Sequence, residues 1–327
     1  MAVDAARTSR TPRILIIRRD NIGDLACTTP LIAALRAQMP RAWLGALVTT
    51  YNAEVLARNP ALDEIFVFEK LKHRTGGLIS HFRSRLGEIS RLRQRKLDFV
   101  LVPASSPQAL KMARGLKPGR IVAAPVNFPT AMHEVERTFE LGRSLGVTGA
   151  PGPLQIYPDT GKALELGREI GAGPFTAVHV SARRPAQRWP LERYAGLVAR
   201  LSKLGRVMLL WAPGSRDNPR HPGDDEAARQ VLDMANVTDK AALVPVATPD
   251  LGTLIAALSL AGRVICPDGG AMHLAAALGK PVVALFGDSP VNRWRPWGVP
   301  HRVVRPDSHD LADLAIEPVL EAFQALA

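Results

Sequence analysis

The stretch RVICPDGGAMHLAAALG, residues 263–279, indicates how this chain folds. Val264–Cys266 form a short apolar run of the kind found in buried parallel strands. Asp268-Gly269-Gly270 then makes a turn, and the Ala-rich residues after it favour a helix that packs closely on a sheet. A strand that turns directly into a helix is the repeating unit of a parallel α/β sheet.

The same alternation occurs twice along the chain. In the first half, strands are predicted at Ile14–Arg18, Leu44–Thr49, Ile65–Phe68, Phe99–Pro103 and Ile121–Ala124, and helices at Pro30–Met39, Ala53–Arg58, Leu78–Leu92 and Val135–Leu145. In the second half, strands are predicted at Thr176–Val180, Val207–Ala212, Ala242–Val246, Val264–Cys266 and Val282–Phe286, and helices near Leu191–Leu204, Asp225–Met234, Leu251–Leu260 and Ala271–Leu278. This pattern predicts two doubly wound, Rossmann-like sheets.

A loop separates the two halves. Residues 146–153 contain three Gly and two Pro, which is typical of a break between domains. We therefore expect domains at residues 1–152 and 153–327 of the 327-residue chain. Open sheets bind ligands at the carboxyl ends of their strands, so we expect a site where two such domains face each other across a cleft.

Composition narrows the classes of partner. The net charge of +12 suits a phosphorylated substrate, an anionic lipid surface or nucleic acid, or it reflects a lineage rich in Arg. The segment Lys70–Lys96 holds nine basic residues but has Phe82 as its one aromatic, so a base-stacking nucleic-acid surface is not expected. With two distant cysteines, no secretory h-region and no membrane-spanning run, we expect a cytoplasmic protein without disulfides or a zinc site.

Three strand ends carry candidate chemistry. In RRDNIGD at 18–24, Asp24 is either a general base or the N-cap of the next helix. At 268–273, two glycines at a helix start suit a diphosphate, and His273 lies about one turn further on. The alternative is a capped helix with His273 at a polar surface position, but Gly-Gly is a poor choice for merely starting a helix, so ligand binding is favoured. HVSARRPAQRWP at 179–190 offers Ser and Arg side chains for phosphate oxygens, or is a solvated basic loop.

Two other motifs give weaker or negative information. The loop GDSP…NRWRPWG, residues 287–298, could line a ligand site or pin domains together. Neither G-x-G-x-x-G nor G-x-x-x-x-G-K-[ST] occurs, which argues against a dinucleotide fingerprint and a P-loop.

Taken in order, these motifs resemble one known family. The pieces are ILIIRRDNIGDL at 14–25, TPLIAALR at 29–36, HEVER at 133–137, RWP at 188–190 and PDGGAMHLAAALGKPVVALFG at 267–287. They are similar to glycosyltransferase family 9, the ADP-heptose:lipopolysaccharide heptosyltransferases. The resemblance implies a GT-B fold and an inverting transfer without a metal or cofactor, from a nucleotide-sugar to an acidic, phosphorylated lipid A–core acceptor.

The resemblance also implies roles for individual residues. Asp24 matches the family's catalytic base, which favours that role over the N-cap. Arg18, Arg19, Asn21 and Gly23 beside it are then acceptor-binding candidates in an N-terminal acceptor domain. In a C-terminal nucleotide-sugar domain, the donor-binding candidates are Ser181, Ala182, Gln187, Arg188, Glu226, Asp268, Gly269, Gly270 and His273. The basic charge is expected to favour peripheral contact with the inner membrane surface.

The chain departs from the family pattern at two places. Gln187 stands where the family often has Lys, so Arg183, Arg184 or Arg188 is expected to supply the charge. An apparent insertion at 217–224 precedes the acidic nucleoside contact, for which Asp225 and Glu226 are the candidates. The sequence therefore leaves three alternatives open. The donor is a different nucleotide-sugar, the acceptor is a protein, or the chain is a non-catalytic protein that binds a nucleotide-sugar. No D-x-D sequence is present, which agrees with a metal-free route.

Overall fold

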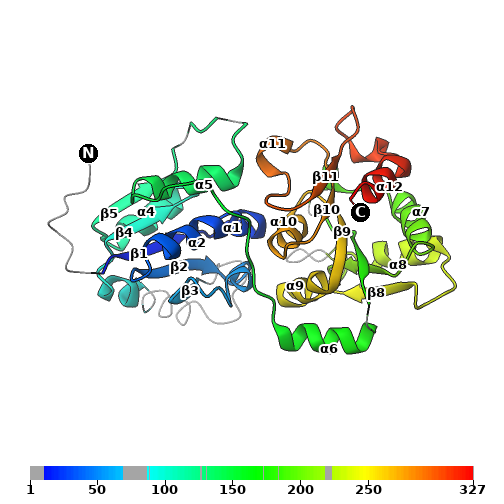
Figure 1. Cartoon of the computed structure of the whole chain (residues 1–327), viewed down its shortest axis with the longest axis horizontal. Helices are drawn as coiled ribbons and strands as arrows, with labels where there is room; N and C mark the ends of the chain where they lie inside the picture. The colour runs from blue at the N-terminus through cyan, green and yellow to red at the C-terminus, as the bar shows by residue number, and fades with distance from the viewer. Residues whose placement is uncertain are drawn as a thin grey trace. The chain divides into compact units, whose positions relative to one another are not determined.

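The computed structural model describes residues 11–68, 87, 89–125, 127–129, 131–171, 173–182, 184–217 and 223–326. The chain divides into two compact units, Met1–Gly152 and Pro153–Ala327. Each unit consists of a parallel sheet with helices around it (Figure 1). No helix in these described ranges is long and apolar enough to cross a membrane.

The first unit contains a five-stranded sheet in the order β3-β2-β1-β4-β5. The strands are β1 Arg13–Ile17, β2 Trp43–Thr49, β3 Glu64–Phe68, β4 Phe99–Val102 and β5 Arg120–Ala123. In β1, Ile14 pairs with Leu44 on one side and with Phe99 on the other. The chain order therefore reverses at β1, and such a switch point is where open sheets bind ligands.

Helices of the first unit connect these strands. They are α1 Ile22–Ala26, α2 Thr29–Gln38, the 3-10 turn η2 Ala53–Val55, α4 Pro107–Gly115 and α5 Glu134–Arg143. The helix predicted at Ala53–Arg58 is wrong, because only one 3-10 turn forms there. Asn59 precedes Pro60, and a residue before proline is disfavoured in a helix. Most of the helix predicted at Leu78–Leu92 lies outside the described residues.

The second unit contains a six-stranded sheet in the order β11-β10-β9-β6-β7-β8. The strands are β6 Phe175–His179, β7 Val207–Trp211, β8 Leu243–Ala247, β9 Ala261–Pro267, β10 Val282–Leu285 and β11 His301–Val304. The expectation that the sheet ends with β10 is wrong, because β11 pairs with it from His301 onward. This edge strand has four residues, two of them His301 and Arg302, so it lacks the apolar run that identified the others.

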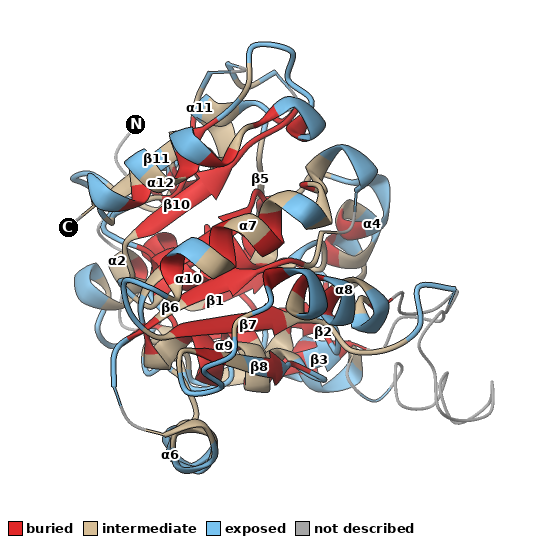
Figure 2. Ribbon diagram, turned by 90° about the vertical axis from the view of Figure 1, so that its right-hand side faces the viewer, coloured by how far each residue is buried: buried red, intermediate tan, exposed pale blue. Residues whose placement is uncertain are grey.

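The remaining helices belong to the second unit. They are α6 Thr160–Ile170, η4 Pro185–Gln187, α7 Leu191–Leu201, α8 Asp225–Ala235, α9 Leu251–Leu260, α10 Gly270–Ala277, α11 Val291–Trp294, η5 Leu311–Asp313 and α12 Ile316–Gln324. Figure 2 shows central strands such as β1, β6, β7 and β10 as buried, in contrast to the partly and fully exposed surface of α6. Seven of the eight residues of α10 are buried, which fits its run of small side chains.

Candidate active site

Asp24 lies in the short helix that follows β1, at the switch point of the first sheet. It is the third residue of α1, and Asn21 occupies the N-cap position. The alternative that Asp24 is the N-cap is therefore wrong. The Asn21 amide makes no cap hydrogen bond and instead donates to Asp24 Oδ2 at 2.8 Å. Asp24 is 8% exposed, so its carboxylate is held largely away from water.

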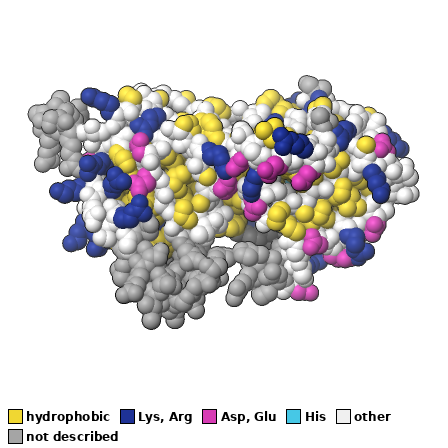
Figure 3. Space-filling model, turned by 90° about the horizontal axis from the view of Figure 1, so that it is seen from below, with side chains coloured by type: hydrophobic (Ala, Val, Ile, Leu, Met, Phe, Trp, Pro, Cys, Tyr) yellow, Lys and Arg dark blue, Asp and Glu magenta, His cyan; other side chains and the backbone are white. Residues whose placement is uncertain are grey.

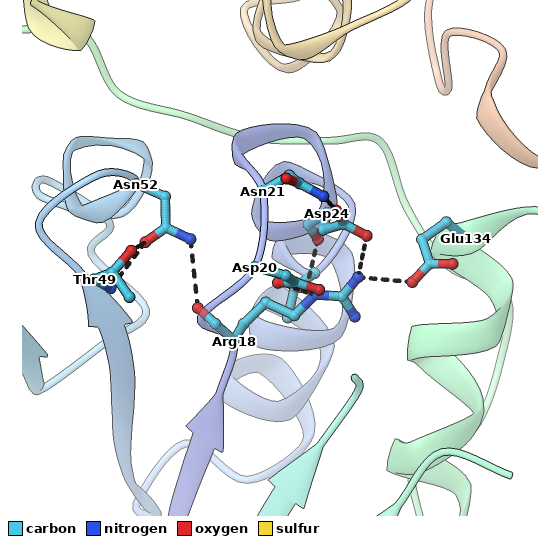
Figure 4. A network of polar contacts seen from close by, with 8 residues as sticks. Arg18, Asp20, Asn21, Asp24, Thr49, Asn52 and Glu134 are labelled. Atoms are coloured by element: carbon cyan, nitrogen blue, oxygen red, sulfur yellow. Dashed lines mark hydrogen bonds and ion pairs between the residues drawn. The ribbon is translucent and has the colours of Figure 1, made fainter. Parts of the chain in front are cut away.

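Arg18, the residue after β1, connects three carboxylates of the first unit (Figure 4). Its Nη2 donates to Asp24 Oδ1 and to Glu134 Oε1, both at 2.7 Å. Its Nε forms an ion pair with Asp20 Oδ1 at 3.0 Å. Arg18 is 1% exposed and Glu134 is 5% exposed. We call Arg18, Asp20, Asp24 and Glu134 the Arg18 cluster.

The Arg18 cluster contains more negative groups than positive ones. Burial alone would lower the pKa of Arg18, but Asp20, Asp24 and Glu134 outweigh it and the pKa rises. Burial raises the pKa of Asp20 to about 6, and the charges of Asp24 and Glu134 add to the effect against the opposing Arg18. One buried guanidinium is thus shared by three carboxylates, of which Asp24 is the candidate general base.

The four residues predicted to bind the acceptor differ in how far they are buried. Arg18 was expected to face acidic groups of an acceptor, but it is buried and paired inside the cluster, so its direct contact is with Asp24. Arg19 is half-buried, with its guanidinium 4.4 Å from the centre of the Phe68 ring. Asn21 is exposed and Gly23 is buried in α1.

In the second unit, Asp268 anchors a polar cluster at the carboxyl end of β9. The Gln187 amide donates to Asp268 Oδ2 at 3.1 Å, and its Nε2 lies 3.5 Å from Ser289 Oγ. Burial raises the pKa of Asp268, while hydrogen bonds from Ser289 and Gln187 and the charge of Arg184 oppose the rise. Gln187, the departure from the family's Lys, thus contacts a predicted donor residue.

The turn at Gly269 is open on the side where a side chain would project. Its φ of 164° is extended backbone that any residue adopts, and a Cβ built there meets no atom within 4 Å. The fold therefore does not require glycine at this position. Gly270 begins α10, whose first amide groups and dipole favour an anion.

His273 is buried one turn into α10. It is 3% exposed, and its ring centre lies 6.0 Å from that of Trp294 in an edge-on arrangement. The alternative of a polar surface position for His273 is therefore wrong. The contact also explains part of the loop at 287–298: Trp294 packs beside the start of α10, within the second unit.

Ser181, Ala182 and Arg188 hold the loop after β6 in place. Ser181 Oγ accepts from the Ala212 amide at 2.9 Å, and Arg188 Nε donates to the Ala182 carbonyl at 3.0 Å. Trp189 is 2% exposed and its indole donates to Leu314 O at 2.9 Å, so it is a core residue. Of the candidate cations that the structure describes, Arg184 has a charge that acts on Asp268. Arg183 lies outside the described residues.

Asp225 and Glu226, the two acidic candidates in α8, differ in their contacts. Asp225 accepts from the Trp211 indole at 2.7 Å and from the Gly214 amide at 2.9 Å, so it orders the loop after β7. Glu226 is exposed and pairs with Arg229 on its own helix. The insertion before them is described only in part, because residues 218–222 lie outside the described set.

Sequence reasoning missed three residues of these clusters. Asp20, Glu134 and Ser289 were not selected as site residues, whereas Arg184 was one of the three cations expected to replace the family's Lys. Glu134 lies 116 positions from Arg18 along the chain, and no local pattern predicts that ion pair. Within the described residues, no group of three or more His, Cys, Asp or Glu side chains is arranged to hold a metal ion.

The family described as glycosyltransferase family 9 (heptosyltransferase) matches residues 120–322. The chain belongs to glycosyltransferase family 9. It is therefore a glycosyltransferase of the heptosyltransferase type, and the family predicted from the motifs is confirmed.

Several lipopolysaccharide heptosyltransferases are similar in sequence to this family 9 glycosyltransferase. It is 27% identical to lipopolysaccharide heptosyltransferase 2 of Salmonella typhimurium, over 90% of this chain and 88% of the relative. It is 24% identical to lipopolysaccharide heptosyltransferase 3 of Escherichia coli, over 84% and 82%. The family 9 glycosyltransferase is thus similar to lipopolysaccharide heptosyltransferases over most of its length.

Solved structures agree on the fold of the family 9 glycosyltransferase. A family 9 glycosyl transferase from Veillonella parvula aligns with a TM-score of 0.80 at 20% identity, over 96% of this chain and 97% of that one. The ADP-heptose lipopolysaccharide heptosyltransferase II of Escherichia coli aligns at 0.77 and 22% identity, over 96% and 98%. The predicted GT-B fold is confirmed.

Proposed function

We propose that this chain transfers heptose from ADP-heptose to the lipopolysaccharide inner core, with inversion at the anomeric carbon and Asp24 as the base. The observation that carries the proposal is the Asp24 carboxylate, which is buried at the switch point of its sheet and shares Arg18 with Glu134. Support for the donor comes from relatives: one Escherichia coli heptosyltransferase structure of similar fold contains ADP-2-deoxy-2-fluoro heptose.

The reaction step follows from the chemistry of a buried carboxylate. Asp24 takes the proton of an acceptor hydroxyl as the oxygen attacks the anomeric carbon of the donor. A new C–O bond forms there while the bond to the β-phosphate oxygen breaks on the opposite face, and ADP leaves with the electron pair. Attack opposite the leaving group inverts the configuration.

Positive groups of the second unit are proposed to stabilise the departing diphosphate. The first amides of α10 and the open turn at Gly269 let backbone approach phosphate oxygens. Arg184 adds charge beside Asp268. Electrostatic stabilisation of this kind needs no metal ion. The other predicted donor residues Ser181, Ala182, Gln187, Arg188, Glu226, Gly270 and His273 stay part of this proposal.

The acceptor side is proposed to act at the cytoplasmic face of the inner membrane. In the first unit, eight basic residues between 89 and 125 are exposed, namely Arg91, Arg93, Arg95, Lys96, Lys111, Arg114, Lys117 and Arg120. Figure 3 shows Lys and Arg side chains close together on the surface of this unit. A basic surface of this kind is attracted to phosphorylated lipid, by about 1 kcal/mol for each residue near it.

The test compares wild type with Asp24→Asn on ADP-heptose and a truncated, phosphorylated lipid A–core acceptor, without added metal. We expect kcat to fall by about 10²- to 10⁴-fold, because the general base is lost. Donor affinity should stay close to that of wild type, since the donor contacts are proposed for the other unit. Asp233→Asn, an exposed carboxylate on α8, is the matched control.

Two results would contradict the proposal in different ways. An Asp24→Asn enzyme as active as the Asp233→Asn control would exclude Asp24 as the base. No transfer by wild type from ADP-heptose, together with turnover of another nucleotide-sugar or a protein acceptor, would keep the fold and discard the donor or acceptor. Gln187, in place of the family's Lys, is the feature that makes this second outcome worth testing.

A further inference from the structure

Glu134 is a buried carboxylate that its own helix does not require. It is the first residue of α5, and its side chain is 6% exposed. The capping box of α5 is already complete, because His133 Nδ1 accepts from Val135 and Glu136 accepts from the His133 amide. Burial of a carboxylate costs free energy unless partners compensate it. Its partner at 2.7 Å is Arg18.

We propose that Glu134 is a positioning residue that acts through Arg18 on the Asp24 carboxylate, where it holds the shared guanidinium in place and balances its charge. The inference rests on the proposed role of Asp24 as the base. It concerns a residue of the first unit that makes no contact with the reacting atoms in this account. Its effect is therefore expected in the pH dependence of transfer.

The orientation argument rests on a shared nitrogen. Arg18 Nη2 donates to Asp24 Oδ1 and to Glu134 Oε1, so the two N–H groups of one nitrogen point at two carboxylates. Asn21 holds the other Asp24 oxygen. Asp20 holds the Nε of Arg18 and Glu134 holds its Nη2, the nitrogen that also contacts Asp24. Glu134 is therefore expected to help set the direction in which Nη2 meets Asp24 Oδ1.

The basicity argument follows from the charges around the cluster. The groups that face it are Arg18 at the end of β1, Asp20 in the next loop, Cys27 at the end of α1, and Glu134 with Arg137 on α5. An arginine paired with one carboxylate alone would make that carboxylate a poor proton acceptor. Glu134 shares the Arg18 guanidinium with Asp24 and places a second negative charge in the cluster, so its removal changes the charge balance next to the proposed base.

The charges of the cluster also act on the pKa values of two nearby groups, Asp20 and Cys27. The charges of Asp24 and Glu134 both raise the pKa of Asp20, and both raise the pKa of the buried Cys27 thiol, for which burial itself is the main cause. Interacting carboxylates titrate as a group, so the acid limb of a pH profile belongs to the whole cluster. Removal of one negative charge should move that limb.

The experiment records kcat and KM from pH 5 to 9 for wild type, Glu134→Gln, Glu140→Gln and Asp24→Asn, with ADP-heptose and the truncated acceptor. For Glu134→Gln we expect the acid limb of kcat to move down by about one pH unit and the plateau to fall roughly fivefold. The KM for ADP-heptose should stay within about twofold of wild type. Glu140→Gln removes the same charge from an exposed position on α5 and should overlay wild type.

A Glu134→Gln profile with its acid limb at the wild-type position would overturn the inference, even if kcat fell, since a purely structural role would lower kcat without a shift. Glu134→Asp keeps the negative charge and provides a second test if the Gln variant does not fold. The acid limb of its kcat profile should stay at the wild-type position, and a shifted acid limb would also overturn the inference. If Asp24→Asn stays fully active, the proposed base is wrong, and that failure is distinct from an unshifted Glu134→Gln profile.

Discussion

At the scale of single residues, burial determines which charged side chains can meet a ligand. Arg18 follows a strand and looks from its type like an anion-binding group, yet it is 1% exposed and ordered by three carboxylates. Arg19, its neighbour in sequence, is half-buried. Adjacent residues at a strand end point to opposite sides, so one of a pair of arginines enters the interior.

Asp20 makes the stability of the protein depend on pH. Burial raises its pKa to about 6 in the folded protein, whereas an unfolded aspartate titrates near 4. Between these values the folded state holds a proton that the unfolded state has released. The contribution of Asp20 to stability is therefore greatest below about pH 4 and is lost as the pH rises through 6.

The first prediction is that Asp20→Asn becomes relatively more stable as the pH rises. The difference in Tm between variant and wild type should increase from pH 4.5 to pH 8, because only wild type must ionise a buried carboxyl over that range. Differential scanning calorimetry at both values measures it, with Asp233→Asn as the exposed control. A Tm difference that is equal at the two pH values would contradict the prediction.

The Tm of the variant must be compared with that of wild type at each pH, because a second residue changes stability with pH in the opposite direction. Burial lowers the pKa of His179, at the end of β6, to about 4. Its unfolded value is near 6.5, so stability from this residue rises with pH between about 4 and 6.5. The two trends oppose each other in the wild-type curve, and the difference between variant and wild type separates them.

At the scale of elements, buried strands were the most predictable part of the fold. Strands such as β2 and β10 are continuous apolar runs, and their observed ends fall within one residue of those predicted. The helices α1, α4, α6, α11 and α12 and the edge strand β11 were missed. The helix α1 is short, α6 has no buried residue and β11 begins with two polar residues, so these elements give a weak periodic signal. The helix α12 does bury Ile316, Val319 and Phe323, and its pattern was overlooked.

The candidate site was predictable where it follows directly from a strand end. Asp24 and Asp268 come shortly after β1 and β9, and local motifs were enough to select them. Glu134 and Ser289 join the same clusters from distant parts of the chain, at separations of 116 and 102 residues from their partners. A single sequence contains no signal for such pairings, because they depend on how helices and loops pack.

Gly269 permits a prediction that separates folding from ligand binding. A Cβ at this position meets nothing within 4 Å and the backbone is extended, so Gly269→Ala should fold normally. Its stability should be unchanged or raised by up to about 1 kcal/mol, because alanine restricts the unfolded chain. If the diphosphate of the donor approaches this backbone, the added methyl should raise the Kd for ADP by about tenfold or more.

Calorimetric titration with ADP and thermal unfolding of the same samples provide the two measurements for Gly269→Ala. Gly152→Ala, in the linker and equally open around its Cβ, is the matched control and should leave ADP affinity unchanged. Wild-type ADP affinity in Gly269→Ala would show that the diphosphate does not lie against this turn.

At the scale of the whole molecule, the two units carry different parts of the proposed chemistry. The base and its cluster belong entirely to Met1–Gly152, and the proposed donor contacts belong entirely to Pro153–Ala327. A donor-binding unit that is separate from the base lets one half keep its nucleotide-sugar specificity while the other adapts to an acceptor. Donor and acceptor should therefore slow amide exchange in different stretches of the chain.

This division predicts the pattern of hydrogen exchange when ADP binds to the full-length protein. Amides at the start of α10 and in the loop after β6 should exchange more slowly, because they are proposed to bind the diphosphate and its surroundings. At 100 times its Kd, ADP adds about 2.7 kcal/mol to the stability of whatever it orders, enough for a roughly hundredfold slowing. Residues 18–26 of the first unit should change little with ADP alone. In Gly269→Ala at the same ADP concentration, a tenfold higher Kd should reduce the slowing at α10 from roughly hundredfold to about tenfold. Protection that appears around residues 18–26 and not at 268–273 would mean that the nucleotide binds the first unit, and would reverse the proposed assignment of donor and acceptor.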